Sequence, residues 1–228
     1  MSDTKRHIII GDIHGCIASL NALLAKLEPY RDRIHVFLGD YIDRGPDSFG
    51  VIERLIEFGS QAECVFLRGN HEQMALDAFL EGDEENWRHW TMNGGRTTID
   101  SYTRAGTDLL ESQGHLDFML GTDFYYETPD FLCVHGGINP YMSVSENLAQ
   151  VDPYEFLWER RHINTVAPEW EKTVIFGHTP MATVRLERNM IGLDTGCVFP
   201  DRGFGHLSAL LMPERDIIDV ICNDNTPS

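Results

Sequence analysis

The chain has 228 residues, enough for one α/β domain that buries about 70% of the surface of its unfolded chain. Its 36 acidic and 18 basic residues give a net charge of -18, which argues against a nucleic acid or an anionic membrane as the main partner, because both attract a basic surface. No apolar run approaches the ~20 residues of a membrane span, and the polar start of the chain predicts no signal peptide. We therefore expect a single domain over residues 1–228.

The first third of the chain alternates between strands and helices. Short apolar, β-branched runs at 7–10, 34–38 and 64–67 predict buried strands. Between them, 17–27 and 51–56 show the apolar spacing of amphipathic helices. Strands that alternate with helices in this way predict a parallel sheet with right-handed crossovers.

The middle of the chain differs in composition from what precedes it. Residues 72–120 are more polar and mostly helical in pattern, and they predict a cap-like segment over the sheet. Within it, the acidic run at 81–85 predicts a loop, and the Asn-Gly-Gly sequence at 93–95 predicts a break between helices.

The second half of the chain returns to strands. Apolar runs predict strands at 131–134, 174–176 and 190–193, and a final antiparallel pair at 207–212 and 217–222. The stretch between 139 and 168 contains three prolines and shows no regular period, so we expect it to be irregular.

Polar side chains follow most of the predicted strands, at the point where each strand ends. They are Asp12 and His14, then Asp40, Asp43 and Arg44, then Asn70, His71 and Glu72, and later His135, His178 and Asp194. Because ligands of open α/β sheets bind where the carboxyl ends of the strands meet, we expect these side chains to share one crevice.

A cluster of buried carboxylates and imidazoles needs a compensating charge, and a divalent metal is the simplest one. A mixture of Asp, Asn and His suits Mn, Fe, Zn or Co better than Ca. The number of candidate ligands exceeds that of one tetrahedral site. The sequence therefore favours two metals about 3.5–4 Å apart, with one Asp between them.

Five short blocks carry a resemblance to a known family. They read GDIHG at 11–15, GDYIDRG at 39–45, GNHE at 69–72, HGG at 135–137 and GH at 177–178. Together and in this order they resemble the PPP-type serine/threonine protein phosphatases, which belong to the calcineurin-like metallophosphoesterases. The short length and the segment around 93–98 resemble the bacterial and phage branch, similar to bacteriophage lambda phosphatase. The resemblance implies an α/β fold (α+β in some schemes), a β-sandwich of two mixed sheets flanked by helices.

The resemblance also implies two divalent metal ions and their ligands. These are Asp12 and His14 for the first metal, Asp40 between the two metals, and Asn70, His135 and His178 for the second. Mn²⁺ is the expected ion, and Fe, Zn, Co or Ni are alternatives that the same ligands accept.

The catalytic roles follow from the same resemblance. His71 would be the general acid, because it directly follows the ligand Asn70 and cannot easily share its metal. Asp43 would orient the ring of His71. Arg44 would hold two phosphoryl oxygens with its planar guanidinium, and Asn70 would also contact the substrate.

The second arginine of the phosphate site is less sharply defined by the sequence. The segment Trp158-Glu159-Arg160 resembles a short Trp-x-Arg block of the family, which assigns Arg160 to the phosphate. Arg161 follows directly, so it stays an alternative.

The activity implied is that of a dinuclear-metal phosphomonoesterase. It would hydrolyse phosphoserine and phosphothreonine in proteins, with phosphotyrosine as a further substrate, by direct attack of a metal-bridging hydroxide. The partners implied are phosphoprotein or phosphopeptide substrates, with no nucleic acid, no membrane and no obligate regulatory subunit, on a monomer.

Four alternatives compete with a protein phosphatase. Symmetrical diadenosine tetraphosphate hydrolases share the first block but usually carry Ala in place of Asp43 and Asp in place of Glu72. A small-molecule phosphomonoesterase would use the same chemistry. A cysteine-dependent tyrosine phosphatase needs Arg six residues after its Cys, and no cysteine meets that spacing; Arg202 follows Cys197 by only five. A catalytically silent binding module would not need the intact set of ligands.

The cysteines of the chain are odd in number and scattered, without a CxxC pair. They are Cys16, Cys64, Cys133, Cys197 and Cys222. This pattern predicts no disulfide framework and no zinc ribbon, and it favours a reducing cytoplasmic location. We interpret all five as packing residues.

Overall fold

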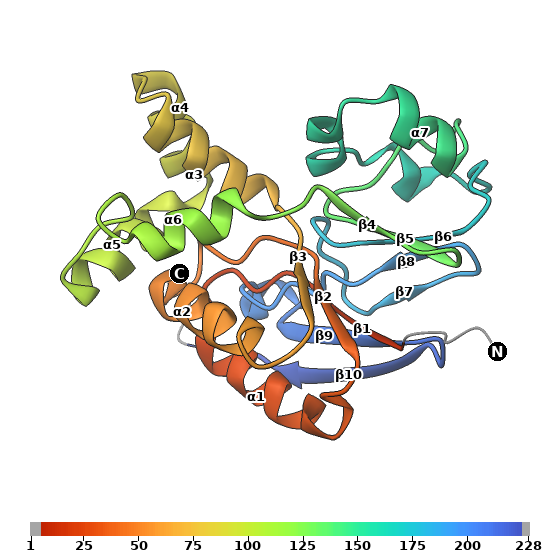
Figure 1. The fold of residues 1–228 in the computed structure, drawn as a ribbon, viewed down its shortest axis with the longest axis horizontal. Coiled ribbons are helices and arrows are strands. Elements are labelled where there is room, and N and C mark those ends of the chain that lie inside the picture. Colours follow the sequence, from red (N-terminus) through yellow and green to blue (C-terminus); the bar gives the residue numbers. More distant parts are fainter. Residues whose placement is uncertain (1–5, 225–228) are drawn as a thin grey trace.

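Two five-stranded sheets form the centre of the molecule (Figure 1). The computed structural model describes residues 6–224. The first sheet has the order β10-β9-β1-β2-β3 and the second has the order β4-β5-β6-β8-β7. The strands are β1 His7–Ile10, β2 Ile34–Phe37, β3 Cys64–Phe66, β4 Tyr125–Glu127, β5 Phe131–Val134, β6 Thr173–Phe176, β7 Arg185–Leu186, β8 Met190–Gly192, β9 His206–Met212 and β10 Asp216–Ile221.

Helices cover the outer faces of the two sheets and gather at one end of them (Figure 1). The α-helices are α1 Ile17–Leu27, α2 Ser48–Gly59, α3 Asn70–Leu80, α4 Glu84–Trp90, α5 Arg96–Ala105, α6 Gln113–Leu120 and α7 Val144–Gln150. Short 3₁₀ turns lie at Glu28–Tyr30, Pro153–Leu157, Arg161–Asn164 and Pro200–Arg202, and one π turn lies at Thr91–Gly95. No helix within residues 6–224 combines the length and the apolar character that a membrane crossing demands.

Both sheets are mixed, which confirms the expected fold class. In the first sheet, β1 pairs in parallel with β2 and antiparallel with β9. In the second, β5 pairs in parallel with β6 and antiparallel with β4. The parallel run β1-β2-β3 and the antiparallel pair β9-β10 agree with the elements expected from the sequence.

The alternation of side chains along β1 explains how the layers stack. Ile8 and Ile10 face the helix side, where they join the cluster that includes Leu20 of α1 and Leu55 of α2. Ile9 points to the opposite face and packs with residues of both sheets. A third cluster fills the space between the second sheet and α7. The order of layers is therefore helix, sheet, sheet, helix.

Some local expectations were wrong. Glu84 and Glu85, expected in a loop, begin α4, because the Asp83 carboxylate accepts a hydrogen bond from Asn86 N and caps the helix. The stretch 139–168, expected to be irregular, contains α7 and two 3₁₀ turns. The expected break at 93–95 is present, with Gly94 at φ 117° between α4 and α5.

Ile9 offers a test of the contact between the sheets. Its side chain is fully buried among residues of both sheets. We expect Ile9→Ala to lower the free energy of unfolding by about 2–5 kcal/mol in urea denaturation, because it removes buried methyl groups and leaves a cavity. Ile221→Ala is the matched control on β10, where the side chain is 67% exposed, and it should change stability by less than about 0.5 kcal/mol. Equal effects of the two variants would contradict this account of the core.

Candidate active site

The loops that follow five strands bring the candidate residues together. Asp12 and His14 follow β1, Asp40 to Arg44 follow β2, Asn70 and His71 begin α3 after β3, His135 follows β5, and His178 follows β6. All of these side chains are buried except Arg44, which is partly exposed. These residues therefore form one cluster at the carboxyl ends of the strands.

The backbone of these loops is strained at the functional positions. Positive φ angles at residues other than glycine cost about 1–3 kcal/mol each and persist where the surroundings enforce them. Among the described residues six have such angles, and five of the six are His14, Asp40, Asp43, Arg44 and His178. The strained backbone of these loops therefore sets the directions of these side chains.

The carboxylate of Glu72 joins the loop after β2 to the loop after β3. It accepts hydrogen bonds from the backbone N–H groups of Gly69 and Asp40, each at 2.9 Å, and of Tyr41 at 2.8 Å. Burial raises the pKa of Glu72 to about 7. Sequence reasoning assigned Glu72 no structural role, although Glu three residues after the start of a helix is half of a capping box and signals this contact.

Three donor atoms of the second predicted metal set converge on one point. His135 Nε2 lies 2.9 Å and His178 Nδ1 lies 2.8 Å from Asn70 Oδ1, and the two ring nitrogens are 3.2 Å apart. The other nitrogen of His135, Nδ1, donates to Leu38 O at 2.9 Å, so the lone pair of Nε2 faces the cluster. Asp40 Oδ1 lies 3.3 Å from His135 Nε2.

The first predicted metal set lies on the other side of Asp40. His14 Nε2 is 3.4 Å from Asp40 Oδ2, and His14 Nδ1 donates to Ile42 O at 2.9 Å. Arg44 Nη1 donates to His14 Nε2 at 2.7 Å. Asp12 Oδ2 accepts the backbone N–H of His178 at 2.8 Å, which connects the two sets.

The charges and the unpaired atoms of this cluster fit divalent cations. Asp12 Oδ1 and His178 Nε2 are buried polar atoms without a hydrogen-bond partner. Burial and the nearby Asp194 raise the pKa of Asp12 well above its usual range. Burial opposes a charge on Asp40, yet the imidazoles around it, His135 first, hold its pKa well below its usual range. Carboxylate, amide and imidazole ligands of this kind suit Mn, Fe, Zn or Co.

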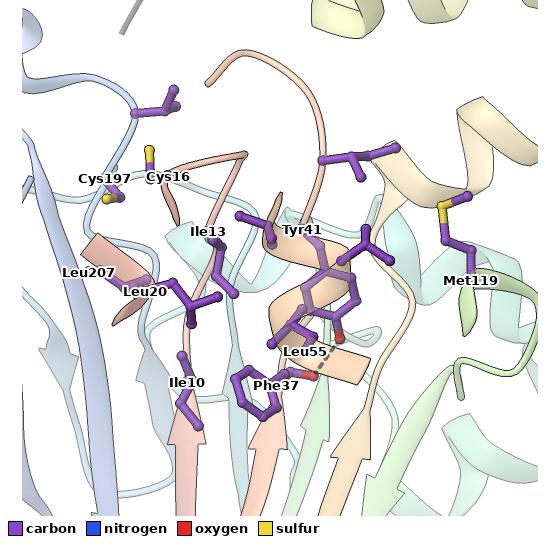
Figure 2. Close-up of a cluster of buried hydrophobic side chains, with 14 of the residues drawn as sticks. Ile10, Ile13, Cys16, Leu20, Phe37, Tyr41, Leu55, Met119, Cys197 and Leu207 are labelled. Atoms are coloured by element: carbon purple, nitrogen blue, oxygen red, sulfur yellow. Dashed lines mark hydrogen bonds between the residues drawn. The ribbon is translucent and has the colours of Figure 1, made fainter. Parts of the chain in front are cut away.

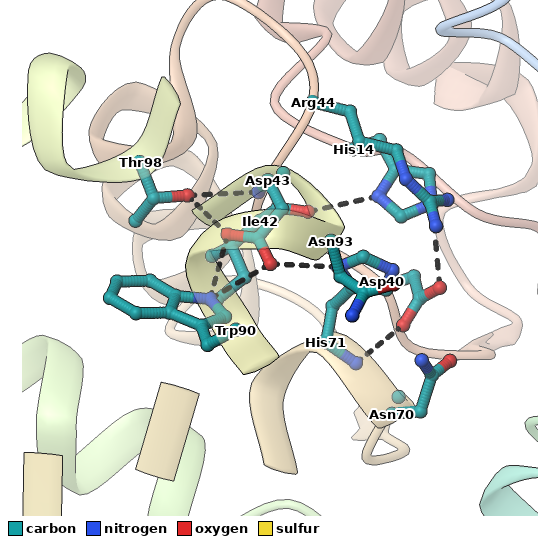
Figure 3. Close-up of polar contacts among 12 residues, drawn as sticks. His14, Asp40, Ile42, Asp43, Arg44, Asn70, His71, Trp90, Asn93 and Thr98 are labelled. Carbon is teal, nitrogen blue, oxygen red and sulfur yellow. Dashed lines mark hydrogen bonds and ion pairs between the residues drawn. The ribbon is translucent and has the colours of Figure 1, made fainter. Parts of the chain in front are cut away.

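His71 and Asp43 form a buried pair beside the donor sets (Figure 3). His71 Nδ1 lies 2.7 Å from Asp43 Oδ2, and the ring stands edge-on to that of His14, with centroids 4.8 Å apart. Two further donors reach the same carboxylate from the helical segment: Trp90 Nε1 at 2.9 Å and Thr98 Oγ1 at 2.6 Å. Sequence reasoning missed both, because no motif spacing connects α4 and α5 to residue 43.

The protonation of this pair follows from its surroundings. Burial raises the pKa of Asp43 to about 8 and lowers the pKa of His71 to about 3, so at neutral pH the pair keeps one proton that either partner can carry. The hydrogen bonds from Trp90 and Thr98 favour an ionised carboxylate. Asp43 and Nδ1 of His71 therefore share one proton, and in either arrangement Nε2 of His71 keeps its own proton.

The two arginines expected at the phosphate lie on different sides of the cluster. The backbone N–H of Arg44 donates to Gly94 O at 3.3 Å, so the break between α4 and α5 helps to hold it. Arg160 is exposed, and its guanidinium makes no hydrogen bond or ion pair within the described part of the chain, but its charge acts on His178. Arg161, the alternative, is paired with Glu159. The geometry leaves Arg160 the freer of the two.

Aromatic side chains stand beside the cluster on its exposed side. Trp158 packs edge-on to His178, with ring centroids 5.9 Å apart, and stacks with His89 of α4 at 6.4 Å. The Trp158 side chain is 45% exposed and lines a surface hollow of about 510 Å³ together with Tyr154 and Arg160. A substrate that reaches the cluster therefore passes an aromatic surface.

Comparison with known proteins decides the family. The family model of calcineurin-like phosphoesterases matches residues 5–208. The chain belongs to this family. It is therefore a phosphoesterase of a family that uses divalent metals. Two groups of its side chains have ligand atoms within 4.8 Å of one another and could hold such ions: His14, Asp40 and His71, and Asp40, His135 and His178.

The relatives differ in the substrates that their names state. Serine/threonine-protein phosphatase 1 of Salmonella typhimurium is 33% identical over 208 residues, which cover 85% of this chain and 88% of the relative. The asymmetrical bis(5'-nucleosyl)-tetraphosphatase PrpE of Oceanobacillus iheyensis is 27% identical over 240 residues, which cover 93% and 90%.

A solved structure supports the fold. The cold-active protein-tyrosine phosphatase of a psychrophilic Shewanella species superimposes with a TM-score of 0.68 at 16% identity, and the match covers 96% of this chain and 78% of the other. The likeness to the bacteriophage branch stays a prediction.

Metal binding tests the two donor sets separately. We expect EDTA-treated protein to bind two Mn²⁺ per chain in calorimetric titration, because the sets share only Asp40. Asp12→Asn and His178→Ala should each reduce the stoichiometry to about one, since each variant removes a ligand from one set. His206→Ala is the control: its ring bonds to Asp219 on β10 at 2.8 Å and should not affect binding. A wild-type stoichiometry of one would refute the assignment of two sites.

Proposed function

We propose that this phosphoesterase hydrolyses phosphate monoesters on serine and threonine side chains of proteins. The observation that carries the proposal is the buried pair of Asp43 and His71, 2.7 Å apart, beside the metal donor sets. The alkoxide of serine or threonine is a strongly basic leaving group and needs a proton as it departs. The phosphate released from an anhydride is a much weaker base and departs without one. A positioned general acid therefore fits an ester of an alcohol better than a nucleotide anhydride.

Different residues of the chain act on different parts of such an ester. Arg44 and Arg160 bind oxygens of the phosphoryl group, and Asn70 contacts the substrate as well. Asp43 occupies Nδ1 of His71, so the opposite nitrogen, Nε2, delivers the proton to the leaving oxygen as its bond to phosphorus breaks. Two divalent ions on the donor sets would supply positive charge at the phosphoryl oxygens and a water of lowered pKa.

A second candidate substrate is a bis(5'-nucleosyl) tetraphosphate. The name of the Oceanobacillus relative supports it, and that match covers 93% of this chain. The exposed ring of Trp158 beside His178 favours it too, because an aromatic side chain can stack on a nucleobase for about 1–3 kcal/mol. A small-molecule phosphomonoester would use the same acid and the same arginines.

The remaining parts of the proposal concern conditions and partners. Mn²⁺ suits the Asp, Asn and His ligands, and phosphoproteins or phosphopeptides are the proposed partners of a monomer without a regulatory subunit. A cytoplasmic location fits the five cysteines, which are all free thiols in the structure.

One experiment distinguishes these substrates by how strongly their hydrolysis depends on the general acid. We expect the wild type to show a higher kcat/KM on a phosphoserine peptide than on diadenosine tetraphosphate. His71→Asn should lower kcat on the peptide by about 10²–10⁴-fold. The loss should be much smaller on para-nitrophenyl phosphate, whose leaving group needs less protonation, and His206→Asn should have no effect on any substrate.

Two results would contradict the proposal. Equal losses for His71→Asn on all three substrates would mean that the ring does not act as the acid. A wild-type preference for diadenosine tetraphosphate would replace the protein phosphatase with the nucleotide hydrolase.

A further inference from the structure

Three cysteines from distant parts of the chain meet at one point outside the active-site cluster. Cys16 precedes α1, Cys197 lies in the loop between β8 and β9, and Cys222 follows β10. Their three sulfur atoms all lie within 4.8 Å of one another. Figure 2 shows the side chains of Cys16 and Cys197 together at the margin of the hydrophobic core. The interpretation of these residues as simple packing does not account for this convergence.

The cluster is buried at its base and open at one side. Cys16 is completely buried and Cys197 is 2% exposed, whereas Cys222 is partly exposed. The backbone fixes the last of them, since Cys222 N donates to Gly205 O at 2.8 Å. The other two cysteines, Cys64 and Cys133, lie outside this cluster. An ion could therefore reach the three sulfurs from the side of Cys222.

Two of the thiols make only weak contacts with backbone oxygens. Cys16 Sγ donates to His14 O at 3.6 Å, and Cys222 Sγ donates to Asp224 O at 3.9 Å, so metal binding would replace no strong hydrogen bond. A thiolate is the form of cysteine that binds metal ions.

We propose that Cys16, Cys197 and Cys222 bind a single thiophilic metal ion, for which Zn²⁺ is the typical occupant. Sulfur ligands of zinc lie at about 2.3 Å from the metal, so in tetrahedral geometry they are roughly 3.8 Å apart. The sulfurs need to move together by no more than about 1 Å to reach this spacing. The thiols that are still protonated lose their protons to solvent as the three Zn–S bonds form, and water occupies the fourth position on the open side.

Such an ion would add a direct link between three segments, which the Gly196–His206 bridge and the hydrogen bonds of Ala18 and Ser19 to Asp224 already hold close together. It would connect the start of α1, the loop after Gly196 and the end of β10. Cys16 lies two residues after His14, and Cys197 lies three residues after Asp194, so the ion would also stabilise two loops that reach the active site. Its ligands are sulfur atoms only, which separates it chemically from the oxygen and nitrogen donors of the active site.

Cadmium is the probe for this site, because Cd²⁺ bound to thiolates gives an ultraviolet charge-transfer band that oxygen and nitrogen ligands do not give. We expect full-length, reduced, EDTA-treated protein to develop this band and to saturate at one thiolate-bound Cd²⁺ per chain. Cys222→Ser should abolish the band, and Zn²⁺ added in excess should displace it. Cys64→Ser and Cys133→Ser are the matched controls and should keep the band at full amplitude.

The cadmium bands of the variants are compared only where the variant folds like the wild type. Cys222 is the residue of choice because it is partly exposed, and circular dichroism checks that its serine variant retains the wild-type helix content. Absence of the band in the wild type would overturn the proposal, and so would its persistence in Cys222→Ser. A thiol count of three instead of five in protein purified without reductant, with no metal bound, would replace the metal site by a disulfide.

Discussion

The active site depends on one buried carboxylate, that of Glu72, which accepts hydrogen bonds from the backbone and, among the described residues, from no other side chain. Glu72 lies at the start of α3, yet its oxygens accept the N–H groups of Gly69, Asp40 and Tyr41. These groups belong to two loops that would otherwise have buried donors without partners, at a cost of about 1–3 kcal/mol each. With the two loops joined, Asp40 and Asn70 are held in the same place although 30 residues separate them in the chain. The close fit also explains Gly69, where a Cβ atom would lie 2.2 Å from Asp40 N.

The helical segment between β3 and β4 has a second role besides covering the sheet edge. Trp90 and Thr98 point from α4 and α5 to the carboxylate of Asp43, and Gly94 accepts the backbone N–H of Arg44. The pair of Asp43 and His71, and Arg44 beside it, therefore depend on residues that lie 47 to 55 positions away from Asp43 in the chain. An insertion or deletion in this segment would disturb the chemistry without touching a motif residue.

The sequence predicted the layout of the molecule for reasons that are local. Apolar runs that end at glycine gave the strands, and polar residues after them gave the cluster, because strand ends in such sheets share an edge. The short strands β4 and β7 were missed, since their side chains are partly or fully exposed and show no apolar run. The contacts of Trp90 and Thr98 were missed because they depend on how helices pack, which no spacing in the chain records. The convergence of Cys16, Cys197 and Cys222 was missed for the same reason.

The substrate is harder to derive than the chemistry because the two are set by different parts of the structure. In the proposed function, the donor sets and Arg44 would act on the phosphoryl group, which every candidate substrate presents alike. The part of the substrate beyond the phosphoryl group would meet Trp158, His89 and Arg160, which stand at the exposed side of the site. An aromatic ring there can pack against a peptide or stack on a base with similar energy. The leaving group is the feature that differs in kind, since an alkoxide would need a proton from His71 and the phosphate released from an anhydride would not. The buried position of that acid, with three donors directed at Asp43, is therefore a stronger argument about the substrate than the shape of the surface around it.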